Sequence, residues 1–157
     1  MNNWIPLSND QYRFVWDKFY ESFNFSPSVH TKDWPSFALP TPYLTYKLTD
    51  YIDSDLDELE EKCVSSLRAI TEPSEYIYAL DWQHESFFYN PHLEKGAANW
   101  IISFYPDGDY YFFLQKDFRW GYLEHPWEHT ITLFGTELIR QFEINKPSIF
   151  GAVVRRS

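Results

Sequence analysis

Apolar residues recur at helical spacing in two segments of the N-terminal half. Ser8 to Gln11 has the Ser-x-x-Gln form of a capping box, which marks a helix start. The apolar face that follows consists of Tyr12, Val15, Trp16, Phe19 and Phe23. A second helix is predicted over Asp53–Ile70, capped by Asp53 or Ser54, with the stripe Leu56, Leu59, Cys63, Leu67 and Ile70. We expect both helices to pack these faces against the core.

The segment between these helices has a different pattern. Residues 24–49 contain four prolines and no sustained period, which excludes a helix interior or a central strand over most of it. Several aromatic residues are interspersed. We therefore predict an irregular arm that packs on the domain and ends in an edge strand at Tyr43–Leu48.

The middle of the chain has the pattern of a sheet. Residues 76–82 are apolar on both faces, as in a central strand, and Gln83–Glu85 is predicted to turn into a strand at 86–89. The strongest strand pattern is a hairpin of residues 100–105 and 110–114 around Pro106–Asp109. The two acids of that loop, Asp107 and Asp109, are interpreted as ordinary turn residues. Residues 118–123 add another strand.

The C-terminal part is predicted to be helical from Pro126 to the residues before Pro147. Its apolar stripe is Trp127, Ile131, Phe134, Leu138 and Phe142. Thr130–Leu133 alone fits a strand equally well. Gly135 within the stripe indicates close packing on a neighbour. Residues 149–154 are predicted to form a final edge strand.

These elements predict an α+β fold in one domain, residues 1–157. We expect a mostly antiparallel sheet of about four to six strands, with the helices packed mainly on one of its faces.

Composition narrows the class of protein. Aromatic residues make up 21% of the chain, so the core is aromatic rather than aliphatic. The net charge of −10 disfavours nucleic acid and anionic membranes and suits a basic protein partner. Cys63 is the single cysteine, which excludes an intramolecular disulfide and a cysteine zinc cluster. No secretory signal and no membrane-length apolar run occurs, so the expected location is the cytoplasm.

Several short motifs occur together in order: Asp81-Trp82-Gln83-His84, residues 105–110, Arg119-Trp120-Gly121, His125-Pro126-Trp127 and Gly135. In this combination the chain resembles a bacterial family catalogued as a domain of unknown function, number 2716. The resemblance covers most of the chain and is densest between Tyr76 and Leu138. It implies a stand-alone bacterial domain and brings no activity, catalytic residue or partner.

The candidate chemistry lies in two short segments. The candidate pocket residues are Asp81, Trp82, His84 and Glu85 from the sheet, with His125, Trp127, Glu128 and His129 from the later segment. His125 and His129 are four residues apart, but His125 precedes Pro126 and the spacing is not His-Glu-x-x-His. A metal site would need three or four converging ligands. We predict no catalytic residue, metal or cofactor, since nucleophile-elbow, Walker and dinucleotide motifs are also absent from the sequence.

The preferred hypothesis is a non-enzymatic protein-binding module. One concrete form is an immunity-type inhibitor of a basic toxin or nuclease, steered by an acidic face of Asp55, Asp57, Glu58 and Glu61. The alternative is a small enzyme or ligand-binding domain, metal-dependent or not, whose pocket contains the candidate residues. Convergence of those groups in one concave pocket favours the alternative. Histidines buried separately favour binding or a structural role.

Overall fold

A computed structural model describes residues 2–95 and 101–157. The described strands are β1 (Trp4–Pro6), β2 (Tyr43–Leu48), β3 (Ile77–Asp81), β4 (Phe87–Tyr89), β5 (Tyr111–Leu114), β6 (Gly121–His125), β7 (Thr130–Phe134) and β8 (Phe150–Arg156). They form one sheet in the order β1-β4-β3-β5-β6-β7-β2-β8, and each neighbouring pair is antiparallel. The α-helices of these ranges are α1 (Asn9–Phe23), α2 (Asp53–Ala69) and α3 (Thr136–Ile144).

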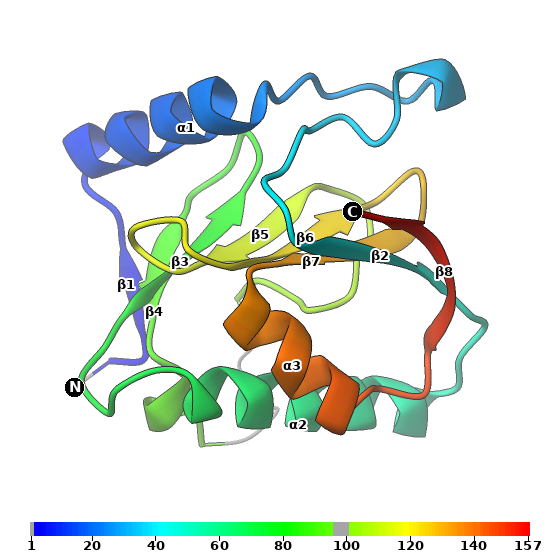
Figure 1. The fold of residues 1–157 in the computed structure, drawn as a ribbon. Helices are drawn as coiled ribbons and strands as arrows, with labels where there is room; N and C mark the ends of the chain where they lie inside the picture. The colour runs from blue at the N-terminus through cyan, green and yellow to red at the C-terminus, as the bar shows by residue number, and fades with distance from the viewer. Residues whose placement is uncertain (1, 96–100) are drawn as a thin grey trace.

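The helices lie on both faces of the sheet. Helix α1 and the arm cover one face, and α2 and α3 cover the other (Figure 1). The α+β class is therefore confirmed, but two details of the prediction are wrong. The described chain has eight strands rather than about four to six, and the helices are not confined mainly to one face. The strands that were not predicted are β1, a segment of three residues, and β7, which lies where the sequence predicts the start of a helix.

Both predicted N-terminal helices are present. The Ser8 N–H donates to Gln11 Oε1 over 2.8 Å, and the Gln11 N–H donates to Ser8 Oγ over 3.2 Å, so the capping box is confirmed. In α2 the cap is Ile52 rather than Asp53 or Ser54, because the Asp55 carboxylate accepts the Ile52 N–H over 3.0 Å. No helix of the described ranges has both the length and the apolar run that crossing a bilayer requires.

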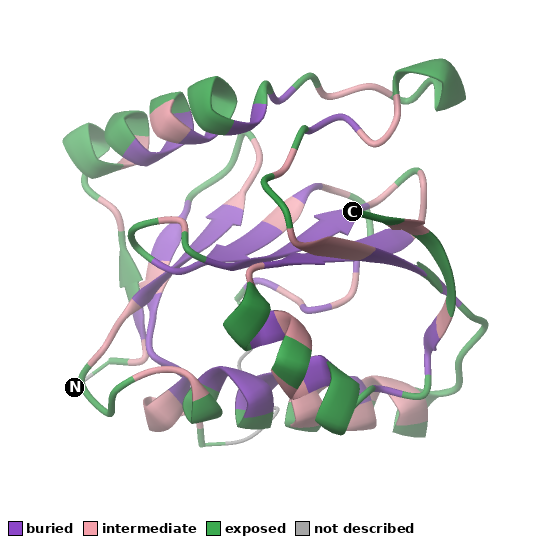
Figure 2. Cartoon of the chain, viewed as in Figure 1, coloured by how far each residue is buried: buried purple, intermediate pink, exposed green. Residues whose placement is uncertain are grey.

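Strand β3 is apolar on both faces because each face packs against a separate core. Tyr78 and Leu80 belong to the core under α1, and Ile77 and Ala79 belong to the core above α2 and α3. The central strands are accordingly almost wholly buried (Figure 2). This double burial leaves the ends of the strands as the places where polar side chains reach solvent.

The predicted hairpin of residues 100–105 and 110–114 is wrong. Trp100 lies outside the described residues, and residues 101–105 form no strand. Both edges of β5 are already paired, with β3 and with β6. Ile102 and Phe104 instead pack on the α2 face of the sheet, where the Phe104 and Phe113 rings stack 4.3 Å apart. Their alternating pattern reflects this packing, and the hairpin that does form joins β5 to β6.

The predicted C-terminal helix is correct only in its second half. Thr130–Phe134 is strand β7, which pairs with β6 and β2, and the helix begins at Thr136. Ile131 and Phe134 therefore lie in opposite cores. Gly135 separates the two elements with a φ of +90°, and a Cβ there would lie 2.6 Å from Trp120 Cβ. The predicted close packing at this glycine is confirmed.

Two further strands test the edge predictions. Strand β2 is not an edge strand, because β7 and β8 flank it on its two sides. Strand β8 is at the edge, as predicted. Strand β8 thus pairs with the side of β2 that the sequence analysis predicted to be unpaired.

Trp16 tests the importance of the core under α1. Its ring is 5% exposed and contacts the rings of Phe19, Phe25 and Phe112. We expect Trp16→Ala to lower the free energy of unfolding by about 3–5 kcal/mol, because a large cavity replaces the ring. Chemical denaturation measures this. Phe14 on the same helix is 62% exposed, and Phe14→Ala should change stability by about 0.5 kcal/mol or less. Equal effects of the two substitutions would contradict this assignment.

Candidate functional site

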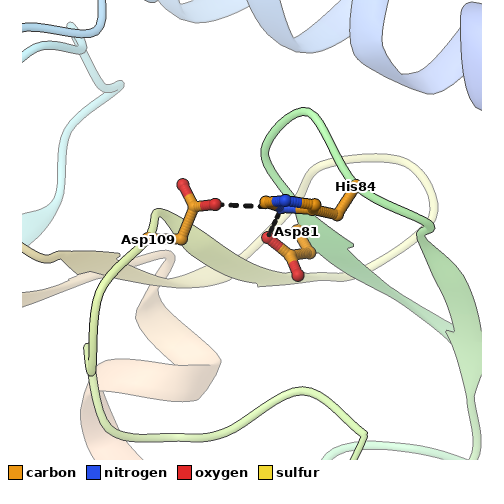
Figure 3. A group of neighbouring side chains, drawn as sticks. All are labelled: Asp81, His84 and Asp109. Atoms are coloured by element: carbon orange, nitrogen blue, oxygen red, sulfur yellow. Dashed lines mark hydrogen bonds and ion pairs between the residues drawn. The ribbon is translucent and has the colours of Figure 1, made fainter.

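Strand pairing brings two distant acids together at one end of the sheet. Asp81 is the last residue of β3 and pairs with Tyr111, the first residue of β5. The Trp82 N–H donates to the Tyr110 carbonyl over 3.1 Å and continues this ladder. Asp109 therefore lies beside the turn that follows Asp81 (Figure 3).

His84 connects these acids. Its Nδ1 lies 3.1 Å from Asp81 Oδ1 and 3.0 Å from Asp109 Oδ2. The two carboxylates are about one-fifth exposed, whereas the imidazole is 65% exposed. We call Asp81, His84 and Asp109 the sheet-end triad. These are the residues of the described chain whose ligand atoms converge as in a metal site.

The backbone around the triad is held by hydrogen bonds. Ser86 Oγ accepts the Asp81 N–H over 3.1 Å and the Trp16 indole N–H over 3.3 Å. The Tyr110 N–H donates to Asp109 Oδ1 over 2.8 Å, which leaves Oδ2 directed at His84. Gln83 adopts a φ of +65°, which closes the turn. These hydrogen bonds hold the backbone of Asp81 and orient the Asp109 carboxylate.

Burial and mutual charge set the electrostatics of the triad. Partial burial, reinforced by the Asp109 charge, raises the pKa of Asp81 to about 6, although His84 opposes the shift. The hydrogen bond that His84 donates to the Asp81 carboxylate, and then the charge of Asp81, raise the pKa of His84. The raised pKa of His84 favours the imidazolium form, and an imidazolium between two carboxylates leaves the triad with a net negative charge.

His125 belongs to a different environment. It is fully buried under the arm, where its Nε2 lies 3.0 Å from Ser36 Oγ and 3.4 Å from the Tyr110 hydroxyl. Its Nδ1 accepts the Glu128 N–H over 3.0 Å. In the neutral ring Nε2 therefore carries the proton and donates it to Ser36 or Tyr110. A Ser–His nucleophile needs the opposite tautomer, so this pair holds the arm on the sheet and does not activate the serine.

The remaining candidates of this segment diverge from the triad. His129 Nε2 lies 2.6 Å from the Tyr105 hydroxyl, and the Glu128 carboxylate forms a bidentate ion pair with Arg155. Trp127 is 40% exposed, and Glu85 is exposed in the turn. The eight candidate residues do not form one pocket: Asp81 and His84 converge, and the three later ionisable groups each bind elsewhere.

Half of the predicted acidic face has internal partners. Glu58 Oε1 accepts the Ser148 N–H over 2.6 Å, and Asp55 binds both the Ile52 N–H and the Ser148 hydroxyl. Asp57 and Glu61 are exposed. Asp55 and Glu58 thus fasten the start of α2 to the loop before β8, and their carboxylates have structural partners within the chain.

Sequence reasoning missed two acids. The sequence pattern interprets Asp109 as an ordinary turn residue. Only the pairing register of β3 and β5, which the sequence does not show, places it beside Asp81 and His84. Glu124 is fully buried on the α2 face of β6, and no hydrogen bond is found for either carboxyl oxygen among the described residues. Burial raises the pKa of Glu124 well above its ordinary value, so the group is held in its protonated form.

Comparison with known proteins assigns the chain to a family. The family model described as Protein of unknown function (DUF2716) matches residues 6–139. The chain belongs to this family. The resemblance drawn from the motifs between Tyr76 and Leu138 is therefore confirmed. The DUF2716 match includes all three residues of the sheet-end triad.

A curated relative extends the comparison over nearly the whole chain. This DUF2716 chain is 29% identical over 162 residues to a Bacillus subtilis (strain 168) protein named "Uncharacterized protein YxiI", and the alignment covers 96% of this chain and 98% of the relative. No solved structure matches the chain. Neither the family description nor the relative's name states an activity, so the function is argued from the geometry.

The pH dependence of stability tests whether burial keeps His125 neutral. Burial lowers its pKa from about 6.5 to about 4, so between these pH values the unfolded chain binds a proton that the folded chain does not. Its contribution to stability is present above pH 6.5 and is lost as the pH falls to 4, by about 3 kcal/mol. We expect the stability difference between wild type and His125→Asn to shrink by this amount from pH 7 to 4, measured by urea denaturation.

The comparison between wild type and variant isolates this residue. Asp81, with its raised pKa, acts in the opposite direction over the same range, but it is present in both proteins. His30→Asn, at an exposed position of the arm, is the matched control for the loss of a histidine. A constant difference for His125→Asn would show that this ring is not held neutral by burial.

Proposed function

We propose that the protein is a cytoplasmic protein-binding module that recognises a basic partner at the end of the sheet that carries the triad. The observation that carries this proposal is the meeting of acids and partly exposed aromatic rings on that end. The Tyr110 ring contacts the rings of Trp82 and Trp127 at 5.8 and 5.3 Å. We call Tyr20, Asp81, Trp82, Asp109 and Trp127 the acidic-aromatic surface.

The composition of this surface is that of a binding hot spot. The Trp82 indole N–H donates to the Tyr20 hydroxyl over 2.8 Å, and Tyr20 and Trp127 are each 40% exposed. Tryptophan and tyrosine are enriched among residues that dominate binding energy. The neighbouring carboxylates supply the complement to lysine and arginine, and the net charge of −10 favours approach of a basic protein.

The arrangement of the histidines supports binding over catalysis. His84, His125 and His129 each have separate partners, and His125 has the tautomer that cannot accept a proton from Ser36. A cavity of about 160 Å³ lies under the arm between Phe37, Thr45 and Thr132. Its lining contains none of the eight candidate pocket residues. The separation of the histidines thus favours the protein-binding hypothesis over the small enzyme.

The immunity-type inhibitor is the concrete form of this proposal. Such an inhibitor occludes a basic toxin or nuclease, and its acids occupy the surface that binds phosphate in the substrate. In this form the acidic-aromatic surface makes the contact. Asp57 and Glu61 add long-range attraction, since Asp55 and Glu58 already serve the fold.

Affinity capture from a lysate of the source bacterium tests the proposal. We expect wild type to retain a protein with an isoelectric point above about 9, and Trp127→Ala to weaken its binding about 30-fold, which corresponds to 2 kcal/mol for a lost hot spot. The control is Phe14→Ala, which removes an exposed ring of α1 outside this surface and should bind as wild type does. Surface plasmon resonance with the purified partner gives the affinities.

Binding kinetics distinguish the contribution of the α2 acids from that of the acidic-aromatic surface. Asp57→Asn with Glu61→Gln should slow association and flatten its salt dependence while leaving dissociation unchanged. Trp127→Ala should mainly accelerate dissociation. Retention of the same proteins by wild type and Trp127→Ala would remove the acidic-aromatic surface as the binding site.

A further inference from the structure

We propose that the sheet-end triad binds a divalent first-row transition-metal ion through Asp81 Oδ1, His84 Nδ1 and Asp109 Oδ2. This inference goes beyond the proposed function and does not depend on it. The three ligand atoms lie within 4.8 Å of one another and come from two segments that only the β3–β5 pairing brings together.

The distances fit an ion as well as they fit a hydrogen-bonded histidine. His84 Nδ1 lies 3.1 and 3.0 Å from the two carboxylate oxygens. Two ligands that bind one ion at right angles, each about 2.1 Å from it, are about 3.0 Å apart. The nitrogen therefore already stands at the spacing of an octahedral edge from both oxygens. In the proposed complex the ion takes the place of the proton that His84 shares with the two carboxylates.

The support of the ligands also suits a metal site. Asp109 Oδ1 accepts the Tyr110 N–H over 2.8 Å, and this bond orients the carboxylate so that Oδ2 faces the histidine. The Asp81 backbone is anchored through Ser86, which the Trp16 indole also contacts. In the described part of the chain, the ion pairs of Asp81 and Asp109 are those with His84, so no lysine or arginine competes for them.

The ligand set selects the class of ion. Two carboxylates and one imidazole suit Mn²⁺, Fe²⁺, Co²⁺ and Zn²⁺, whereas Mg²⁺ and Ca²⁺ prefer all-oxygen sites. The imidazole is 65% exposed, so water has access to the remaining coordination positions. An exposed site with three protein ligands and water is open to exchange, as in a catalytic or sensing site, rather than closed as in a structural one.

Titration with metal salts tests the site on the isolated protein of residues 1–157. We expect isothermal titration calorimetry with Mn²⁺, Co²⁺ and Zn²⁺ to give one site that binds tighter than about 100 μM, and Mg²⁺ to bind at least tenfold more weakly. His84→Ala and Asp109→Asn should each weaken the transition metals at least tenfold. The visible absorption spectrum of Co²⁺ provides a second readout, because loss of the nitrogen ligand changes its d–d bands.

The variants include controls for folding and for charge. Asn is an ordinary turn residue, so Asp109→Asn keeps the loop, and the exposed position of His84 means that His84→Ala keeps the core. Asp57→Asn removes one charge from the exposed part of α2 and should bind as wild type does. Equal binding by wild type, His84→Ala and Asp109→Asn, or no one-site binding up to about 1 mM, would overturn the proposal.

Discussion

Both faces of the sheet are covered by aromatic layers, and this double burial constrains the rest of the structure. Strands β6 and β7 are buried along their whole length, because α1 with the arm covers one side and α2 with α3 covers the other. Each buried aromatic ring removes about 150–250 Å² from water, so neither layer can be stripped without a large loss of stability. Polar side chains on these strands must therefore be satisfied inside or lie at the ends.

His125 and Asp81 follow these two outcomes, whereas Glu124 follows neither. His125 stays neutral at a strand end under the arm, where Ser36 and Tyr110 satisfy it and fasten the irregular segment to the sheet. Glu124, on the opposite face of the same strand, is held protonated by burial. Asp81 lies one position beyond the fully buried part of β3 and reaches solvent. The sheet-end triad thus exists because β3 and the segment before β5 leave the covered region at the same place.

Local signals predicted the parts of the fold that depend on local chemistry. The capping box at Ser8, the stripe of α2 and the two apolar faces of β3 are each encoded within a few residues, and the structure contains them. The errors arose where tertiary pairing overrides pattern. Ile102 and Phe104 alternate like a strand but pack on a face, because β5 has no free edge. Ile131 and Phe134 match a helical stripe but belong to opposite cores across a strand.

Tertiary pairing also explains which residues of the site the sequence predicts and which it does not. Asp81 and His84 are neighbours in sequence, so their pairing was accessible from the chain alone. Asp109 joins them only through the β3–β5 register, and its place in a Pro-Asp-Gly-Asp segment made a turn the sufficient explanation. Conversely, His125 and His129 are close in sequence, but their rings have different partners. His125 contacts Ser36 of the arm, whereas His129, which has a positive φ, contacts the Tyr105 hydroxyl.

The triad links the two proposals through charge. With His84 protonated, the imidazolium partly neutralises the two carboxylates, and the surface keeps a net negative charge that attracts a basic partner. In the proposed metal complex, His84 Nδ1 and the same oxygens hold a divalent ion, whose charge neutralises the two carboxylates. Under the two proposals, a bound ion and a partner's lysine or arginine compete for Asp81 and Asp109. Because such coupling is reciprocal, the factor by which bound metal lowers the affinity for the partner equals the factor by which the bound partner lowers the affinity for the metal.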